Sequence, residues 1–199
     1  MNLSIFYIIM IYGMKKFFSP SYNVYIMQKE VLPNPNLLYK AFRERIYEYY
    51  IKPAKSVSAF AQGVLCSTLI DFLAKILYPK KGVGDRIKEF LVKKIKFSKE
   101  NAESFYSYVR NGLIHEGRVK CGCYLDNEIE ETVQIIDGVL KFNPDIILKE
   151  VEIWLKHYFE KILKGEETYQ RIRDYVEKNI INEDLDAIEK RHNGNMFPC

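Results

Sequence analysis

The feature that most constrains the fold is a long apolar segment at residues 56–78. On a helix, its apolar side chains cover most of the circumference, and they are Val57, Phe60, Ala61, Val64, Leu65, Leu69, Ile70, Phe72, Leu73, Ile76 and Leu77. A helix that is apolar nearly all round is typically buried at the centre of a domain. The segment therefore predicts an α-helical bundle built around residues 56–78.

Apolar residues recur at helical spacing in several other segments. These predict helices from Asn36, as N-cap, to a stop at Pro53, then at residues 85–96, 98–117, 144–165 and 167–189. Ser98 and Asn143, the latter followed by Pro144, are the expected N-caps, and Gly117 is the expected stop of the 98–117 helix. Asp137-Gly138 lies between two β-favouring runs, which is a strong hairpin signal because a type I′ turn needs two positive φ angles. We predict an all-α bundle of about five to six helices with one small β-hairpin at about residues 132–142.

The chain divides by composition into residues 1–33, an apolar N-terminal extension, residues 34–190, the helical domain, and residues 191–199, a tail. The first 14 residues are uncharged but fall short of the roughly 20 apolar residues of a membrane span. Their lysines follow the apolar run, unlike those of a signal peptide. We expect no stable membrane insertion: the segment docks on the core, or the true start is Met14 or Met27. A membrane tether at residues 3–13 is the alternative.

Charge and cysteine content restrict the possible partners and cofactors. Thirty basic and 26 acidic residues leave a net charge of +4, which is compatible with a nucleic-acid partner. Four cysteines are too few for a disulfide scaffold, so a reducing cytoplasm is expected. Cys121 and Cys123 form a C-x-C pair, but the three histidines lie at unrelated spacings, so we predict no metal site and no cofactor.

The segment Tyr108 to Gly117, YVRNGLIHEG, carries the residues best suited to chemistry. Arg110 is a permanent planar cation suited to phosphate oxygens and to a pentacoordinate transition state. His115 can give or take a proton near neutrality. Asn111 lies four residues before His115, about 40° away on the same helix face, whereas Arg110 is about 140° from His115 and must reach across.

This Arg-x4-His pattern, with Asn111 directly after the arginine and a basic Arg118-x-Lys120 beyond it, resembles the HEPN superfamily over roughly residues 56–164. Many members of that superfamily are metal-independent RNA endonucleases of toxin–antitoxin or antiviral defence systems. The resemblance implies that Arg110 and His115 are catalytic, that Asn111 supports them, and that two motifs meet across a homodimer. It also implies RNA binding at Arg118 and Lys120 and a possible antitoxin partner.

A dimer is also reasonable chemically, because 2′-hydroxyl attack needs both a base and an acid and each chain offers one histidine here. Where some toxins carry a tyrosine that the antitoxin modifies, this chain has Gly117, which argues against that form of regulation. The nuclease hypothesis requires the Arg110 and His115 headgroups to reach a shared, solvent-accessible cleft between two copies.

Other interpretations stay open. The domain is alternatively a catalytically silent HEPN-like module that binds nucleotide, RNA or a protein partner. Asp71, within the apolar segment, either pairs with Arg110 or His115 or bridges to Lys75. A cluster of aromatic and basic residues is a candidate RNA-stacking surface, although core tyrosines with solvated arginines are more common, and it comprises Arg43, Arg45, Tyr47, Tyr49 and Tyr50.

Overall fold

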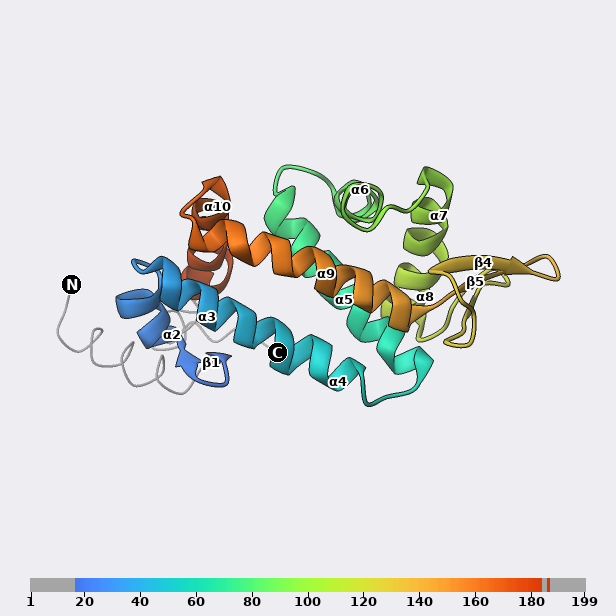
Figure 1. Ribbon diagram of the computed structural model, residues 1–199, viewed down its shortest axis with the longest axis horizontal. Helices are drawn as coiled ribbons and strands as arrows, with labels where there is room; N and C mark the ends of the chain where they lie inside the picture. Colours follow the sequence, from blue (N-terminus) through green and yellow to red (C-terminus); the bar gives the residue numbers. More distant parts are fainter. Residues whose placement is uncertain (1–16, 184–185, 187–199) are drawn as a thin grey trace. The chain divides into compact units, whose positions relative to one another are not determined.

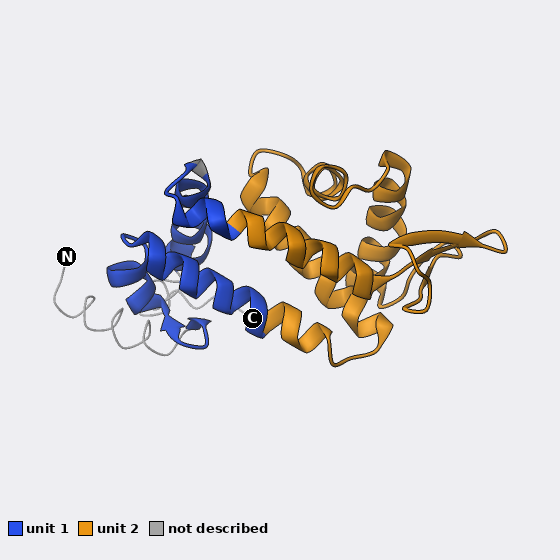
Figure 2. Ribbon diagram, in the orientation of Figure 1, with its two compact units in different colours: residues 1–48, 159–199 blue, residues 49–158 orange. Residues whose placement is uncertain are grey.

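The computed structural model describes residues 17–183 and 186, which belong to two compact units (Figure 2). The first unit combines residues 1–48 with 159–199, and the second is the continuous stretch 49–158. The division predicted from composition, at residues 33 and 190, stays a prediction, and the 191–199 tail and residues 1–16 lie outside the described residues.

The first unit is helical with one small strand pair (Figure 1). Its elements in chain order are the antiparallel strands β1 (Phe17–Ser19) and β2 (Tyr22–Asn23), α2 (Val24–Ile26), the π-helical turn η1 (Met27–Val31), α3 (Pro35–Ile46), the end of α9, α10 (Glu167–Val176) and the π-helical turn η4 (Glu177–Ile181). The predicted cap Asn36 is wrong by two residues, because Asn34 Oδ1 accepts the Asn36 and Leu37 amides and Pro35 occupies the first helical position.

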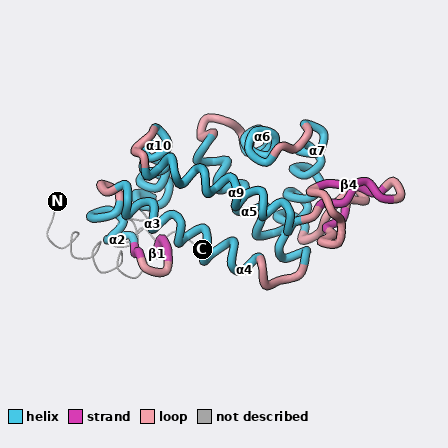
Figure 3. Tube along the Cα trace, viewed as in Figure 1, coloured by secondary structure: helices cyan, strands magenta, loops and turns pink. Residues whose placement is uncertain are grey.

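The second unit contains the central helix and the motif (Figures 1 and 3). Its elements are the π-helical turn η2 (Tyr47–Ile51), which begins in the first unit, α4 (Lys52–Ala54), α5 (Ala59–Leu77), α6 (Val83–Ile95), α7 (Lys99–Ser104), the π-helical turn η3 (Phe105–Arg110), α8 (Asn111–Glu116), the strands β3 (Tyr124–Leu125), β4 (Val133–Ile136) and β5 (Val139–Phe142), and most of α9 (Pro144–Leu163). Pro53 lies inside α4, so helical backbone continues one residue past the predicted stop.

The predicted fold class is confirmed: the described chain is mostly α-helical with a few strands. The hairpin also matches, since Ile136 pairs with Val139 and both Asp137 and Gly138 have positive φ, as a type I′ turn requires. Strand β3 was not predicted. It pairs in parallel with β5 and completes a three-stranded sheet of order β3-β5-β4.

The core of the second unit is aromatic and aliphatic. Phe97, Phe105 and Phe142 form a cluster with ring centroids 5.6 to 6.3 Å apart. Phe90 meets Trp154 edge-on at 5.1 Å, which packs α6 against α9. Such pairs add about 0.5–1.5 kcal/mol each to the free energy of area burial.

Helix α5 is central, but it is not buried on every side as its composition suggested. The side chain of Phe60 is 45% exposed, while Leu69, Ile70 and Leu73 are fully buried. Within the described residues, α5 is also the one helix long and apolar enough to cross a membrane, although half of its apolar window is buried inside the chain. Core helices of soluble proteins share that property.

Residues 99–116 form the motif helix of α7, η3 and α8 in direct succession. Its predicted ends are confirmed: Ser98 Oγ accepts the Asn101 amide, and Gly117 ends the helix with φ +65°. The π-helical turn η3 was not predicted, and it ends at Arg110. Short π-helical turns inside α-helices are frequent at functional sites.

Candidate active site

The motif side chains meet at the junction of η3, α8 and α5. Arg110 Nη2 donates to Asp71 Oδ2 at 2.6 Å, and Arg110 Nη1 donates to Asn111 Oδ1 at 3.0 Å. Arg110 Nη1 also lies 3.4 Å from His115 Nε2. The arginine therefore reaches across the helix to the histidine, and all four predicted residues lie within one cluster.

The two ends of this cluster differ in exposure. His115 is exposed, whereas only 12% of the Arg110 side chain is accessible and 21% of the Asp71 side chain. The sequence hypothesis placed both headgroups in an open cleft. Instead, the imidazole alone faces solvent freely, and the guanidinium is held largely inside its own chain by the Asp71 carboxylate.

The contact between Arg110 and His115 bears on which ring nitrogen of the imidazole carries the proton. A guanidinium only donates hydrogen bonds, so Nε2 must be the acceptor in this contact. The contact is therefore a hydrogen bond only in the tautomer that carries its proton on Nδ1. In that tautomer Nε2 holds the lone pair that a general base uses, and Arg110 Nη1 occupies it in the free protein.

Two glycines let neighbouring backbone approach the site. A Cβ at Gly112 would collide with the Arg118 carbonyl oxygen, so the chain after the motif helix lies directly over α8. A Cβ at Gly63 would lie 2.5 Å from the Leu125 side chain, so β3 packs closely on α5. The Lys120 amide also donates to the Tyr108 carbonyl at 3.0 Å, which closes the turn back onto η3.

The predicted RNA-binding residues Arg118 and Lys120 both form ion pairs with Glu116. The Lys120 ammonium, with smaller help from Arg118, lowers the pKa of the Glu116 carboxyl below its ordinary value. The Arg118 side chain is nevertheless 65% exposed. These cations are available at the surface one turn beyond His115, although a carboxylate offsets part of their charge.

Sequence reasoning did not identify Arg86. Its Nη2 donates to Asp71 Oδ1 at 2.8 Å, so Asp71 is shared by two arginines from different helices. No local pattern indicates this contact, because Arg86 lies 15 residues from Asp71 and on α6. Of the alternatives considered for Asp71, the structure shows the ion pair with Arg110.

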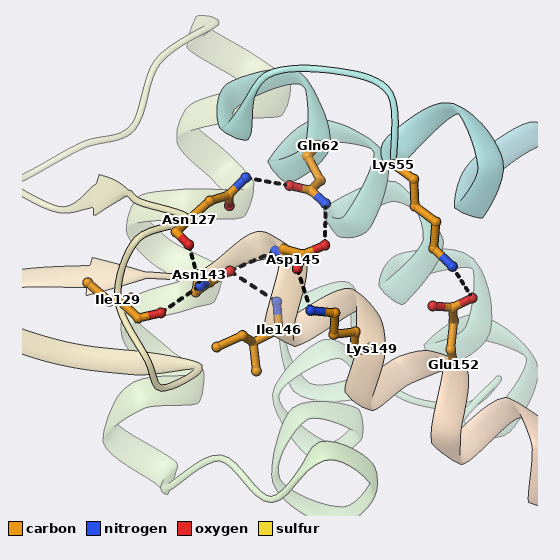
Figure 4. Close-up of polar contacts among 9 residues, drawn as sticks. All are labelled: Lys55, Gln62, Asn127, Ile129, Asn143, Asp145, Ile146, Lys149 and Glu152. Atoms are coloured by element: carbon orange, nitrogen blue, oxygen red, sulfur yellow. Dashed lines mark hydrogen bonds and ion pairs between the residues drawn. The ribbon is translucent and has the colours of Figure 1, made fainter.

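A second polar network lies on α5, near its N-terminus (Figure 4). Gln62 accepts from Asn127 Nδ2 at 3.0 Å and donates to Asp145 Oδ1 at 3.3 Å. Asn143 caps α9 through its Oδ1, and its Nδ2 donates to the Asn127 and Ile129 carbonyls. This network ties the loop after β3 to α5 and α9, and it lacks an exposed reactive group.

The remaining candidate residues are structural or lie at the surface. Tyr50 stacks on Phe72 at 6.1 Å, while Tyr47 and Tyr49 are more than one-third exposed. The Arg43 guanidinium lies 5.5 Å from the Tyr47 ring centroid, and Arg45 packs on the Phe18 ring. In this cluster, Tyr50 and Arg45 therefore pack against other side chains, whereas Tyr47 and Tyr49 lie at the surface.

The three cysteines among residues 17–183 are free thiols. Burial raises the pKa of the Cys66 thiol to about 12, which makes it unreactive. Cys121 is exposed and Cys123 is buried. In the described part of the chain, no three histidine, cysteine or acidic side chains gather in a way that could hold a metal ion.

In comparisons with protein-family models, curated proteins and solved structures, no match to this chain was found.

Proposed function

We propose that the chain is a metal-independent endoribonuclease that cleaves RNA by 2′-hydroxyl attack, with His115 as the proton-transfer group. The observation that carries this proposal is the exposed His115 imidazole held 3.4 Å from the guanidinium of Arg110. Asp71 and Asn111 fix that guanidinium in turn. A proton-transfer group beside a fixed cation is the pair that phosphodiester transesterification needs.

The chemistry divides between the two residues. Substrate displaces the contact between Arg110 Nη1 and His115 Nε2, which frees the single lone pair of Nε2. Nε2 then takes the proton of the 2′-hydroxyl, and the oxygen attacks the adjacent phosphorus. Arg110 is only 12% exposed, so it supplies positive charge to the pentacoordinate phosphorane not from an open cleft but through Nη1, the nitrogen nearest the exposed imidazole. A second histidine protonates the departing 5′-oxygen, giving a 2′,3′-cyclic phosphate and a 5′-hydroxyl. DNA lacks the attacking hydroxyl and is spared.

We assign the second histidine to a second copy of the chain in a homodimer. Exposed apolar side chains lie on the two helices that carry Asp71 and His115: Ile114, next to His115 on α8, is 41% exposed, and Phe60, on α5, is 45% exposed. Phe60 lies three turns before Asp71 on nearly the same face of α5, about 20° away. A two-fold partner covering this surface would bury both side chains and bring two His115 residues together.

The dimer is tested by Ile114→Glu, with Ile153→Glu as the matched control, because Ile153 is an exposed isoleucine on α9. Sedimentation should show a dimer for the wild type and Ile153→Glu, and a monomer for Ile114→Glu. A dimer that survives Ile114→Glu contradicts this placement of the interface.

A catalytically silent module that binds nucleotide, RNA or a protein is the second candidate. It is favoured by the low accessibility of Arg110, whose side chain is 12% exposed and engaged by Asp71. In that case the same cation and the exposed Arg118 attract phosphate without cleavage.

One experiment separates the two candidates. Full-length protein is incubated with bulk RNA in EDTA, as wild type, His115→Ala, Arg110→Lys and Arg110→Ala, with His157→Ala as control because His157 is another exposed histidine. We expect cleavage to fall at least about 100-fold in His115→Ala and to stay unchanged in His157→Ala. Cleavage that persists in His115→Ala refutes the site, and intact RNA with retained binding supports the silent module.

The biological setting we propose is a cytoplasmic toxin–antitoxin or antiviral defence module, with an antitoxin protein as a possible partner. Gly117 offers no hydroxyl for modification at that position. An antitoxin is therefore expected to act by binding, and co-expression with neighbouring genes, scored by growth, tests for one.

A further inference from the structure

The Asp71 carboxylate is the centre of a three-helix charge cluster. Its Oδ1 accepts from Arg86 Nη2 at 2.8 Å, and its Oδ2 accepts from Arg110 Nη2 at 2.6 Å. The side chains of Arg86 and Arg110 are 14% and 12% exposed. One carboxylate therefore balances two largely buried guanidiniums, and the three groups together carry a net charge of +1.

This arrangement is costly for stability. The Nε atoms of Arg86 and Arg110 are both buried and have no hydrogen-bond partner within the described part of the chain. A buried donor left unsatisfied costs about 1–3 kcal/mol. A buried Nε without a hydrogen-bond partner also occurs at Arg173, so the feature particular to this cluster is that one carboxylate serves two arginines.

The sharing of Asp71 limits how Arg110 binds. An arginine facing a free carboxylate often takes both oxygens in a two-pronged pair. Here Arg86 occupies Oδ1, so Arg110 holds Oδ2 through Nη2 alone. Nη1 is thereby left to contact Asn111 and to approach His115.

We propose that Arg86 is a positioning residue of the candidate site: by occupying Asp71 Oδ1, it keeps Arg110 Nη1 directed at His115 Nε2. Arg86 acts through Asp71 and Arg110 and touches neither His115 nor RNA. Arg86 thereby affects the tautomer of His115, because a hydrogen bond from Nη1 to Nε2 keeps the imidazole proton on Nδ1 and the lone pair on Nε2.

The placement of α6 supports this role. Gly84, two residues before Arg86, lies so close to the Tyr106 ring that an added Cβ would be 2.9 Å from it. Lys88 lies over the same ring, with Nζ 5.8 Å from the centroid. The first turn of α6 is therefore seated against η3, the π-helical turn that ends at Arg110. From this helix, Arg86 reaches Asp71 Oδ1, the carboxylate oxygen that Arg110 does not hold.

The test reads the tautomer of His115 directly. Side-chain ¹⁵N spectra are recorded at about pH 9, where imidazole is neutral, for the wild type, Arg86→Met, Arg86→Gln and Arg86→Lys. Lys93→Met is the control, because Lys93 is a cation on the same helix that pairs with Glu89 and not with Asp71. Far-UV circular dichroism identifies the variants that fold.

We expect the fraction of His115 with its proton on Nδ1 to fall on the order of two-fold in Arg86→Met. Arg86→Gln, which is two bonds shorter than arginine, should behave in the same way and replaces Arg86→Met should that variant not fold. Arg86→Lys should keep most of the wild-type fraction, and Lys93→Met all of it. An unchanged fraction in folded Arg86→Met or Arg86→Gln overturns the proposal, as does an equal change in Lys93→Met.

The importance of this geometry for catalysis rests on the proposed nuclease function, whereas the tautomer measurement does not. With an active wild type, Arg86→Met should lower kcat about ten-fold and leave KM within about two-fold, because positioning acts on the reacting geometry. A change in KM alone contradicts the proposal. If the wild type does not cleave RNA, the proposed nuclease function is wrong. The ¹⁵N spectra then still test whether Arg86 sets the tautomer of His115, because that measurement does not depend on activity.

Discussion

Two polar clusters on the same helix, α5, use opposite solutions to the problem of burying polar groups. Near the N-terminus, Gln62 takes part in a network of amides and one carboxylate (Figure 4). Nine residues later on the same helix, Asp71 holds two arginines. In the amide network, Asn143 is 2% exposed and its side chain makes four hydrogen bonds to backbone groups.

The comparison separates a structural cluster from a candidate functional one. The amide network satisfies its buried donors and acceptors, so it specifies the loop geometry at little cost. The arginine cluster leaves two buried Nε groups unsatisfied and ends at an exposed imidazole. Substitutions in the first should therefore reduce stability, and substitutions toward the exposed end of the second should change reactivity with little loss of stability.

The largest loss of stability is expected for Asn143→Ala. The substitution removes the cap of α9 and leaves the carbonyls of Asn127 and Ile129 without this donor. Caps and buried hydrogen bonds are each worth about 1 kcal/mol, so the free energy of unfolding should fall by about 3 kcal/mol in urea denaturation.

Ser98→Ala is the matched control for this measurement. Ser98 is also an N-cap, but it is exposed and its side chain makes one bond, to the Asn101 amide. Its loss should cost about 1 kcal/mol. Equal costs for the two caps would contradict the view that the Asn143 network holds the loop.

The hydrogen-bonded ends of elements were the most predictable part of this fold. Ser98, Asn143 with Pro144, Asp137-Gly138 and Gly117 each imply a local backbone conformation, and each occurs as predicted. These signals are readable because a cap or turn residue bonds to backbone within a few positions of itself.

Contacts between distant segments were not predictable in the same way. Arg86 looks like any basic residue on an amphipathic helix, and its partner Asp71 lies on another helix. Strand β3 has two residues, too short to show any alternation, and its contacts are with distant segments: it pairs in parallel with β5, and its Leu125 side chain packs on Gly63 of α5. The burial of Arg110 also follows from packing, since its spacing from His115 is the same whether it is exposed or not.

The second largest loss is expected for Asp71→Ala, at about 2 kcal/mol in the free energy of unfolding. It leaves Arg86 and Arg110 without their shared acceptor in a largely buried position. Asp126→Ala is the control, because Asp126 pairs with a single lysine, Lys141, at 2.8 Å. That variant should lose less than about 1 kcal/mol, and a larger loss than for Asp71→Ala would contradict the special cost of the two-arginine cluster.

A smaller change in the free energy of unfolding is expected when acid protonates Asp145 in the amide network. The hydrogen bond from Lys149, the largest cause, lowers the pKa of Asp145 below its ordinary value, with smaller help from Gln62. A carboxyl with a lowered folded-state pKa stabilises the fold above its unfolded pKa, and that contribution is lost as the pH falls below about 4. Urea midpoints measured from pH 6 to pH 3 should therefore decline less steeply in Asp145→Asn. An identical slope would show that Asp145 does not contribute.

The smallest effect on stability is expected where the effect on reactivity is greatest, at His115→Ala. His115 is exposed, and its neighbour, Arg110 Nη1, keeps Asn111 as an acceptor when the imidazole is removed. The free energy of unfolding should stay within about 0.5 kcal/mol of the wild type, as for the exposed control His157→Ala. A loss above about 1.5 kcal/mol would make His115 a structural residue. The arginine cluster would then be, like the amide network, a device for holding helices together, and its unsatisfied Nε groups would need another explanation.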